Sequence, residues 1–109
     1  MAMSRREKIE TMLRDDPDDV FLRYSLALEL EGAGEWEAGL EILEALARST
    51  PPYVPAYQMA AQHLVKRGRH ADARLALREG IEAARQQGNG HAAGEMSELL
   101  MSLGAAGEE

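Results

Sequence analysis

The sequence contains no cysteine, and this absence removes several classes of protein at once. Disulfide scaffolds, thiolate zinc centres, iron–sulfur clusters and thiol nucleophiles all need cysteine side chains. The chain also lacks any run of about 18 consecutive apolar residues, which a membrane-spanning helix requires. Its first residues are rich in charge and lack the apolar stretch of a secretory signal. We therefore expect a cytoplasmic protein with no membrane segment.

Aromatic residues are scarce, at 5% of the 109 residues, so the core must be built from aliphatic side chains. Hydrophobic residues make up 45% of the chain and charged residues 28%, which is the balance of an ordinary globular domain. A chain of this length holds one domain. The sequence therefore predicts a single domain over residues 1–109, with a core of Leu, Ala, Ile, Val and Met.

Basic residues are distributed unevenly along the chain. Residues 88–109 contain four acidic residues and no Lys or Arg, whereas residues 51–87 contain six basic and three acidic residues. The net charge of the whole chain is −7, and an acidic protein is repelled by phosphate backbones. We expect no nucleic-acid partner, and we interpret most charges, including those of Arg74 and Arg78, as solvated helix surface.

The chain is similar to itself when it is shifted by 34 residues. A leucine followed four residues later by a glycine occurs twice in this register and a third time 36 residues further on. A fixed period in this range is the sequence signature of a repeat architecture. The matching pairs are Pro17 and Pro51, Ala27 and Ala61, Leu30 and Leu64, Gly34 and Gly68, and Leu43 and Leu77, with Leu100 and Gly104 as the third copy.

Local signals divide the chain into helices. Ser4 and Glu7 form a capping box that begins a helix, and Pro17 ends it. Asp18 and Asp19 lie where the start of the next helix favours hydrogen-bond acceptors and negative charge. Apolar residues then recur at helical spacing, and no window keeps the period of two that a strand requires. The predicted fold class is all-α, with about six helices joined by short turns. The first helix carries apolar residues at Ile9, Met12 and Leu13.

The period, the turn glycines and the small residues where two helices would meet resemble tetratricopeptide repeats. Small side chains let the two helices of a repeat approach closely, and glycine adopts the left-handed turn between them. The resemblance rests on Ala27, Ala61, Gly34, Gly68, Gly39, Ala73, Pro17 and Pro51, and the chain departs from the family pattern at Arg23, Leu46, Gly80 and Arg85.

The resemblance implies an α-solenoid, which is a right-handed superhelix of antiparallel helix pairs. It divides the single domain into five parts along the chain. These are a leading helix at 4–16, a first repeat at 18–51, a second repeat at 52–85, a C-terminal capping helix at 89–103 and a frayed tail at 104–109.

The resemblance also implies where a partner would bind. In this family the concave face is lined by the first helix of each repeat, and it usually holds a peptide or a helix of another protein. The lysines, arginine and asparagines with which some members clamp the carboxylate of chaperone tails are absent, so a chaperone-tail receptor is not expected. The residues of this chain at the groove positions are Phe21, Tyr24, Leu28, Glu31, Gln58, Gln62, Val65 and Lys66.

Phe21, Tyr24 and Leu28 form a stripe of their own, separate from the core-facing residues of the same helix. A helix that is apolar on two sides must bury both or expose one for binding. Either the leading helix or a second copy of the protein covers this stripe, or the stripe is the groove in which a partner docks. The residues alone leave both interpretations open.

The sequence offers no catalytic residue, cofactor site or metal site. The three histidines His63, His70 and His91 lack the spacing of a helical zinc pair. The aspartates around Pro17 lack the alternating donors of a calcium loop and are better interpreted as helix caps. We therefore predict a protein-interaction module that works as a scaffold without catalysis. The alternative is a self-associating structural subunit, a homodimer or assembly component, that uses the same apolar face.

Overall fold

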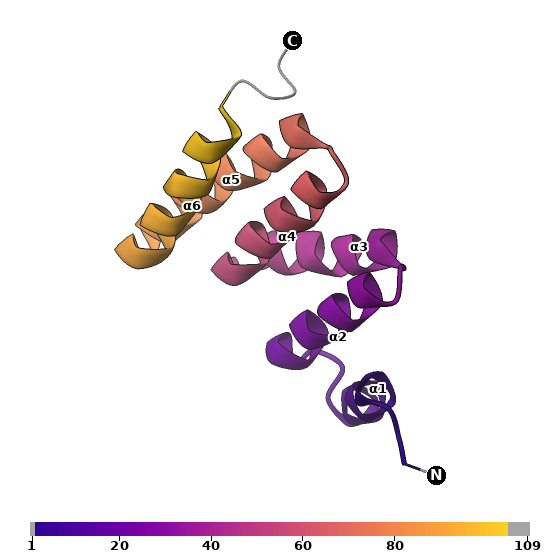
Figure 1. Cartoon of the computed structure of the whole chain (residues 1–109). Helices are drawn as coiled ribbons and strands as arrows, with labels where there is room; N and C mark the ends of the chain where they lie inside the picture. Colours follow the sequence, from indigo (N-terminus) through magenta and orange to yellow (C-terminus); the bar gives the residue numbers. More distant parts are fainter. Residues whose placement is uncertain (1, 105–109) are drawn as a thin grey trace.

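The computed structural model describes residues 2–104, which form six α-helices and no strand. The helices stack in a row of 49 × 30 × 18 Å that begins with α1 and ends with α6 (Figure 1). The predicted all-α class is confirmed. The helices are α1 (Arg5–Asp15), α2 (Val20–Gly32), α3 (Trp36–Ala47), α4 (Val54–Lys66), α5 (His70–Gln86) and α6 (Gly90–Leu103).

Three of the helices begin at side chains that cap their free N–H groups. The Ser4 hydroxyl accepts a hydrogen bond from the Glu7 N–H at 3.1 Å, and the Glu7 carboxylate accepts one from the Ser4 N–H at 3.0 Å. The hydrogen bond from the Ser4 N–H to the carboxylate is the largest cause that lowers the pKa of Glu7. Asp19 caps α2 by accepting from the Leu22 N–H at 2.8 Å, and Asn89 caps α6 in the same way. The predicted capping box and aspartate cap are both confirmed.

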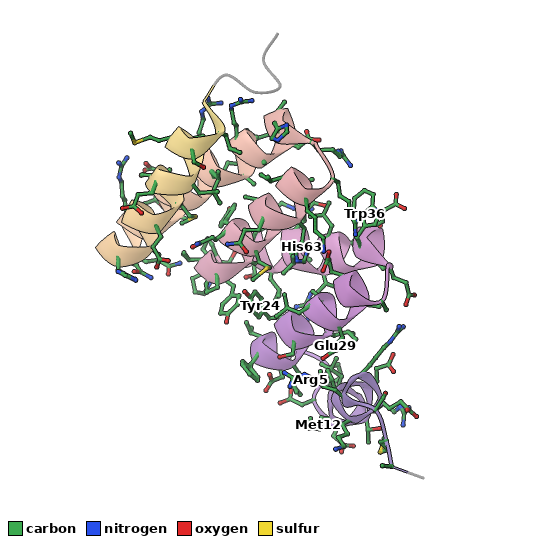
Figure 2. The ribbon with its side chains drawn as sticks, viewed as in Figure 1. Arg5, Met12, Tyr24, Glu29, Trp36 and His63 are labelled. Carbon is green, nitrogen blue, oxygen red and sulfur yellow. The ribbon has the colours of Figure 1, made fainter. Side chains whose placement is uncertain are left out.

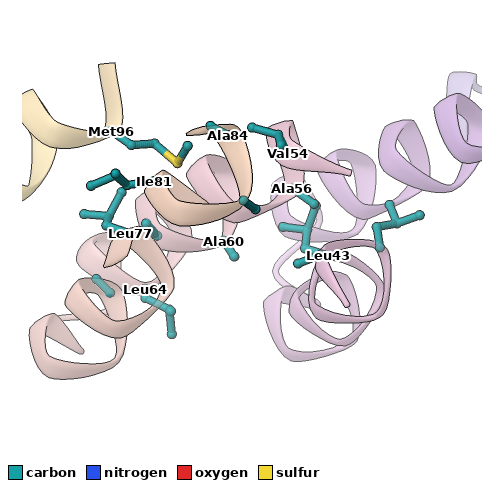
Figure 3. Packing of buried hydrophobic residues seen from close by; sticks show 14 of the residues in the cluster. Leu43, Val54, Ala56, Ala60, Leu64, Leu77, Ile81, Ala84 and Met96 are labelled. Carbon is teal, nitrogen blue, oxygen red and sulfur yellow. The ribbon is translucent and has the colours of Figure 1, made fainter. Parts of the chain in front are cut away.

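The core is a row of helix interfaces, in which each helix packs on the next one along the chain and α4 also contacts α6. Most of the buried residues lie in α3, α4 and α5, and alanines are frequent among them (Figure 3). Fully buried leucines occupy matching places in the second helix of each pair, because Leu43 of α3 and Leu77 of α5 are both 0% exposed. The low aromatic content therefore suits closely packed helices.

Glycine permits the closest helix approaches. A Cβ added at Gly39 of α3 would lie 2.7 Å from the carbonyl oxygen of Ala27 in α2, and Ala73 occupies the equivalent place in α5. A Cβ at Gly80 would lie 2.6 Å from the Cβ of Tyr57 in α4. The departure from the family pattern at Gly80 therefore has a structural reason, since α5 has no room there for a side chain.

The leading helix α1 packs mainly on α2, and only part of its predicted apolar side is buried. Ile9 is 5% exposed, whereas Met12 is 48% exposed and points away from the rest of the chain (Figure 2). Arg5 fixes α1 to α2 through an ion pair with Glu29 at 2.7 Å. Met12 is exposed because no helix lies on the outer side of α1 within the described chain.

The interpretation of Arg74 as a surface charge is also wrong. Arg74 is 2% exposed, and its Nε and Nη2 atoms donate to the carbonyl oxygen of Gly104 at 3.2 and 2.9 Å. The last carbonyl groups of a helix lack donors within the helix, and the guanidinium group of Arg74 supplies them at the end of α6. The predicted frayed tail at 104–109 begins at Gly104, which the structure describes, and its residues 105–109 lie outside the described residues.

Candidate partner-binding surface

The first helices of the successive pairs, α2, α4 and α6, end at equivalent glycines that place them in a common register. Gly34, Gly68 and Gly104 all have positive φ values, which favour glycine. The residue six positions before each of these glycines is Leu28, Gln62 or Glu98. These three residues therefore occupy the same place on consecutive first helices.

This place lies on the side of each helix that is turned away from the second helices α3 and α5. Leu28 precedes the buried Leu30 by two residues, which corresponds to about 200° around a helix of 3.6 residues per turn. In Figure 1, α4 lies in front of α3 and α6 lies in front of α5, so the outward side faces the viewer. We call it the open face. It comprises Phe21 and Leu28 on α2, Pro55 and Gln62 on α4, and His91 and Glu98 on α6.

Two of the predicted groove residues form an exposed apolar patch on this face. Phe21 is 67% exposed and Leu28 is 36% exposed. They lie seven residues apart, two helical turns, on the same side of α2. Neither α1 nor any other helix covers the Phe21 ring within the described chain, so the leading helix is not what shields this part of the stripe.

The third member of the apolar stripe, Tyr24, is held within the protein. Its ring packs edge-on against Tyr53, with 5.6 Å between centroids and 76° between ring planes. Tyr53 precedes α4, so this contact joins the beginnings of α2 and α4 (Figure 2). Burial is the main cause that raises the pKa of Tyr24. Tyr24 therefore helps to hold α2 against the start of α4, and its half-buried ring adds little to the exposed surface of the open face.

Glu31 and Lys66, which we also placed in the groove, bind each other. The Lys66 ammonium group donates to the Glu31 carboxylate at 2.8 Å, and Arg67 lies 3.5 Å from the same oxygen. The hydrogen bond from Lys66 is the largest cause that lowers the pKa of Glu31. Arg67 also stacks over the Trp36 ring at 5.2 Å. These contacts fasten the end of α2 to the end of α4, so Lys66 already has an anionic partner.

The remaining predicted residues lie on α4 and differ in exposure. Gln62 is exposed, Gln58 is half-buried, and Val65 is half-buried against the core. The structure therefore brings all eight predicted residues to α2 and α4. Of these, Phe21, Leu28, Gln62 and Lys66 are exposed, and Lys66 is the one paired with Glu31.

A hollow lies on the other side of the molecule, between α3 and α5 over α4. It has a volume of about 280 Å³, and its floor includes Tyr57, Ala60 and Leu64. Leu75 of α5, at its edge, is 56% exposed. The rim carries both signs of charge. The sequence pattern does not predict this hollow, because the hollow depends on how α3, α4 and α5 meet in space.

His63 is a buried polar residue whose setting the sequence pattern did not reveal. It is 7% exposed, and its Nδ1 atom has no hydrogen-bond partner among residues 2–104. Burial lowers the pKa of His63, and this effect exceeds the opposing influence of Glu31. His63 is therefore a neutral packing residue of α4.

Two further findings limit what the surface can do. No helix within residues 2–104 combines the length and apolar character needed to cross a membrane. In the same part of the chain, no three His, Asp or Glu side chains are grouped so that they could hold a metal ion.

Comparison with known proteins connects this architecture to a family. No model of a protein family matches the chain. The chain is 29% identical to TPR repeat-containing protein PA0015 of Pseudomonas aeruginosa over 100 residues, which cover 92% of this chain and 95% of that protein. The fold of the present chain is similar to the solution structure of protein BPP2914 from Bordetella parapertussis. The TM-score is 0.78 and the identity 27%, over 94% of this chain and 89% of that chain.

The resemblance to tetratricopeptide repeats is therefore confirmed, both by a relative with that description and by an all-helical fold of stacked pairs. At the level of the family, the relationship supports a protein-interaction module.

Proposed function

We propose that this tetratricopeptide-like chain is a non-catalytic, cytoplasmic scaffold that binds a peptide or helix of another protein across its open face. The observation that carries the proposal is the exposure of Phe21, at 67%, beside Leu28 on the outward side of α2. The chain has one phenylalanine, and it lies on a helix whose other side is already buried against α3. Exposed aromatic residues of this kind supply much of the binding energy at protein interfaces.

The polar residues of the same face would orient the partner. The side-chain amides of Gln58 and Gln62 can donate and accept hydrogen bonds, which fits the backbone of an extended segment. Lys66 contributes less than its charge suggests, because Glu31 already binds it. The expected binding residues are therefore Phe21, Leu28, Gln58 and Gln62, with Tyr24, Glu31, Val65 and Lys66 holding the surface in place.

An affinity capture with matched variants tests this proposal. The double variant Phe21→Ser/Leu28→Ser removes the patch, and Leu75→Ser is the control because Leu75 is exposed at the hollow beside α5. Proteins that bind the wild type and the control but not the double variant support binding at the open face. The same set of proteins on all three chains contradicts it.

Self-association is the second candidate, since an exposed Phe21 is also what the surface of a homodimer would present. Sedimentation velocity at micromolar concentration separates the two. A monomer at all concentrations removes the second candidate. If the wild type is a dimer, and Phe21→Ser/Leu28→Ser dissociates this dimer while Leu75→Ser does not, self-association is favoured over binding of a separate partner.

A further inference from the structure

The open face changes in chemistry from one end of the row to the other. At one register position the residues are Leu28, Gln62 and Glu98, on α2, α4 and α6 in turn. An apolar side chain is thus followed by an amide and then by a carboxylate. The same change from apolar to acidic is seen when whole helices are compared. Helix α2 carries the exposed apolar patch, and α6 carries acidic residues without any Lys or Arg.

The carboxylates of α6 are available to a ligand. Glu98 is exposed, and no basic side chain within the described chain pairs with it. Glu95, three residues earlier, is 49% exposed, and among residues 2–104 its ion-pair contact is with His91, at 2.7 Å. By contrast, Glu31 at the other end of the face is occupied by Lys66 and Arg67. The negative charge of the open face that a partner can reach therefore lies at α6.

We infer that the partner is a protein segment with an apolar residue that sits on Phe21 and Leu28 and with lysines or arginines that lie over Glu95 and Glu98. This inference rests on the proposed function and specifies the partner by its charge. Packed helices lie about 8–10 Å apart, and α2 and α4 are not packed directly on each other, so the path from α2 across α4 to α6 is longer than about 20 Å. An extended chain needs more than about six residues to span it.

Charge complementarity favours this occupant over the alternatives. An acidic segment would meet Glu95 and Glu98 with like charge, which is repulsive in a binding surface. A second copy of this chain would bring a net charge of −7 to the same surface. A basic segment gains attraction at α6 and keeps the apolar contact at α2.

Selection from a random dodecapeptide library displayed on phage tests the inference on the purified full chain. The decisive variant is Glu95→Lys/Glu98→Lys. The matched control is Glu41→Lys/Glu44→Lys, which reverses two exposed glutamates of the same spacing on α3. We expect the wild type and the control to select peptides rich in Lys and Arg that contain an aromatic or aliphatic residue, and the α6 variant to lose this selection.

The most enriched peptide is then synthesised and titrated by fluorescence anisotropy. We expect about a tenfold weaker affinity for Glu95→Lys/Glu98→Lys, as two exposed attractions become repulsions, and no more than about a twofold change for the control. Added salt should weaken binding to the wild type. Selected peptides without a basic excess, or equal affinity for the wild type and the α6 variant, would overturn the inference.

The same peptide distinguishes this inference from the proposed function. If Phe21→Ser/Leu28→Ser weakens binding and Glu95→Lys/Glu98→Lys does not, the open face is still the binding site, but the inference that the partner is basic is overturned. Binding that depends on the glutamates alone overturns the placement of the apolar anchor on α2. If no peptide is enriched on the wild type, both are overturned.

Discussion

The helices α2 and α4 occupy the same place in successive pairs, and their packed sides share an alanine and a leucine at equivalent positions. Ala27 and Leu30 of α2 correspond to Ala61 and Leu64 of α4, and all four are buried. Their outward sides differ, because Phe21 and Leu28 correspond to Pro55 and Gln62. The packed side must satisfy the geometry of helix pairs, whereas the outward side is free to carry the chemistry of binding.

The largest expected effect tests whether the two pairs are equally packed. Leu43→Ala and Leu77→Ala each remove a fully buried side chain at the same place in α3 and α5. We expect each to lower the free energy of unfolding by about 2–5 kcal/mol, measured by urea denaturation. A loss below about 1 kcal/mol in one variant and a large loss in the other would show that the pairs are not alike.

The close contact between the helices of a pair is made at Gly39 in the first repeat and at Ala73 in the second, and exchanging glycine and alanine should lower stability at each place for a different reason. Gly39→Ala places a Cβ 2.7 Å from the carbonyl oxygen of Ala27, so the backbone must shift. The strain is about 1–3 kcal/mol, and the better helix propensity of alanine offsets about 1 kcal/mol of it. Net destabilisation of up to about 2 kcal/mol is expected in urea denaturation.

The control for this contact is Ala73→Gly, at the equivalent place in α5. It relieves no clash and loses about 1 kcal/mol through the flexibility of glycine in a helix. A stabilised Gly39→Ala variant would contradict the tight approach of α2 and α3 in the structure.

The smallest effect concerns one position where the two helices differ on their packed sides. Glu29 of α2 forms an ion pair with Arg5 of α1, whereas the equivalent His63 of α4 is buried and uncharged. Burial lowers the pKa of His63, so below its ordinary value of about 6.5 the unfolded chain binds a proton that the folded chain excludes. Stability contributed by this residue is therefore present at higher pH and falls as the pH drops below about 6.5.

His63→Leu tests this dependence because it removes the titrating group and keeps an apolar side chain in the same place. From pH 7 to pH 5 we expect the variant to lose less stability than the wild type, with a difference of at most about 1.4 kcal/mol for each pH unit below 6.5. Equal slopes of unfolding free energy against pH in the two chains would show that His63 does not stay neutral on folding.

Most of the fold could be predicted because it rests on local and periodic signals. The capping box at Ser4, the cap at Asp19 and the glycines at Gly34 and Gly68 are read from neighbouring residues, and the period of 34 joins them into pairs. The burial of Arg74 could not be predicted. It depends on the carbonyl group of Gly104, thirty residues away, lying next to the guanidinium group.

The candidate site was only partly predictable for the same reason. Register alone places Phe21, Leu28 and Gln62 on the outward side of their helices. That Tyr24 packs against Tyr53, and that Glu31 binds Lys66, depends on how α2 and α4 are set against each other. A helical pattern states the side of a helix on which a residue lies. It does not state which neighbour reaches that residue.

The contrast between the packed and outward sides of α2 is tested most directly by urea denaturation of Phe21→Ser/Leu28→Ser beside Leu30→Ser. Phe21 and Leu28 are 67% and 36% exposed, whereas Leu30 is 6% exposed. We predict that the double variant loses less than about 1 kcal/mol of unfolding free energy and that Leu30→Ser loses more than about 3 kcal/mol. A double variant as destabilised as Leu30→Ser would show that the outward stripe is part of the core, and would contradict the account.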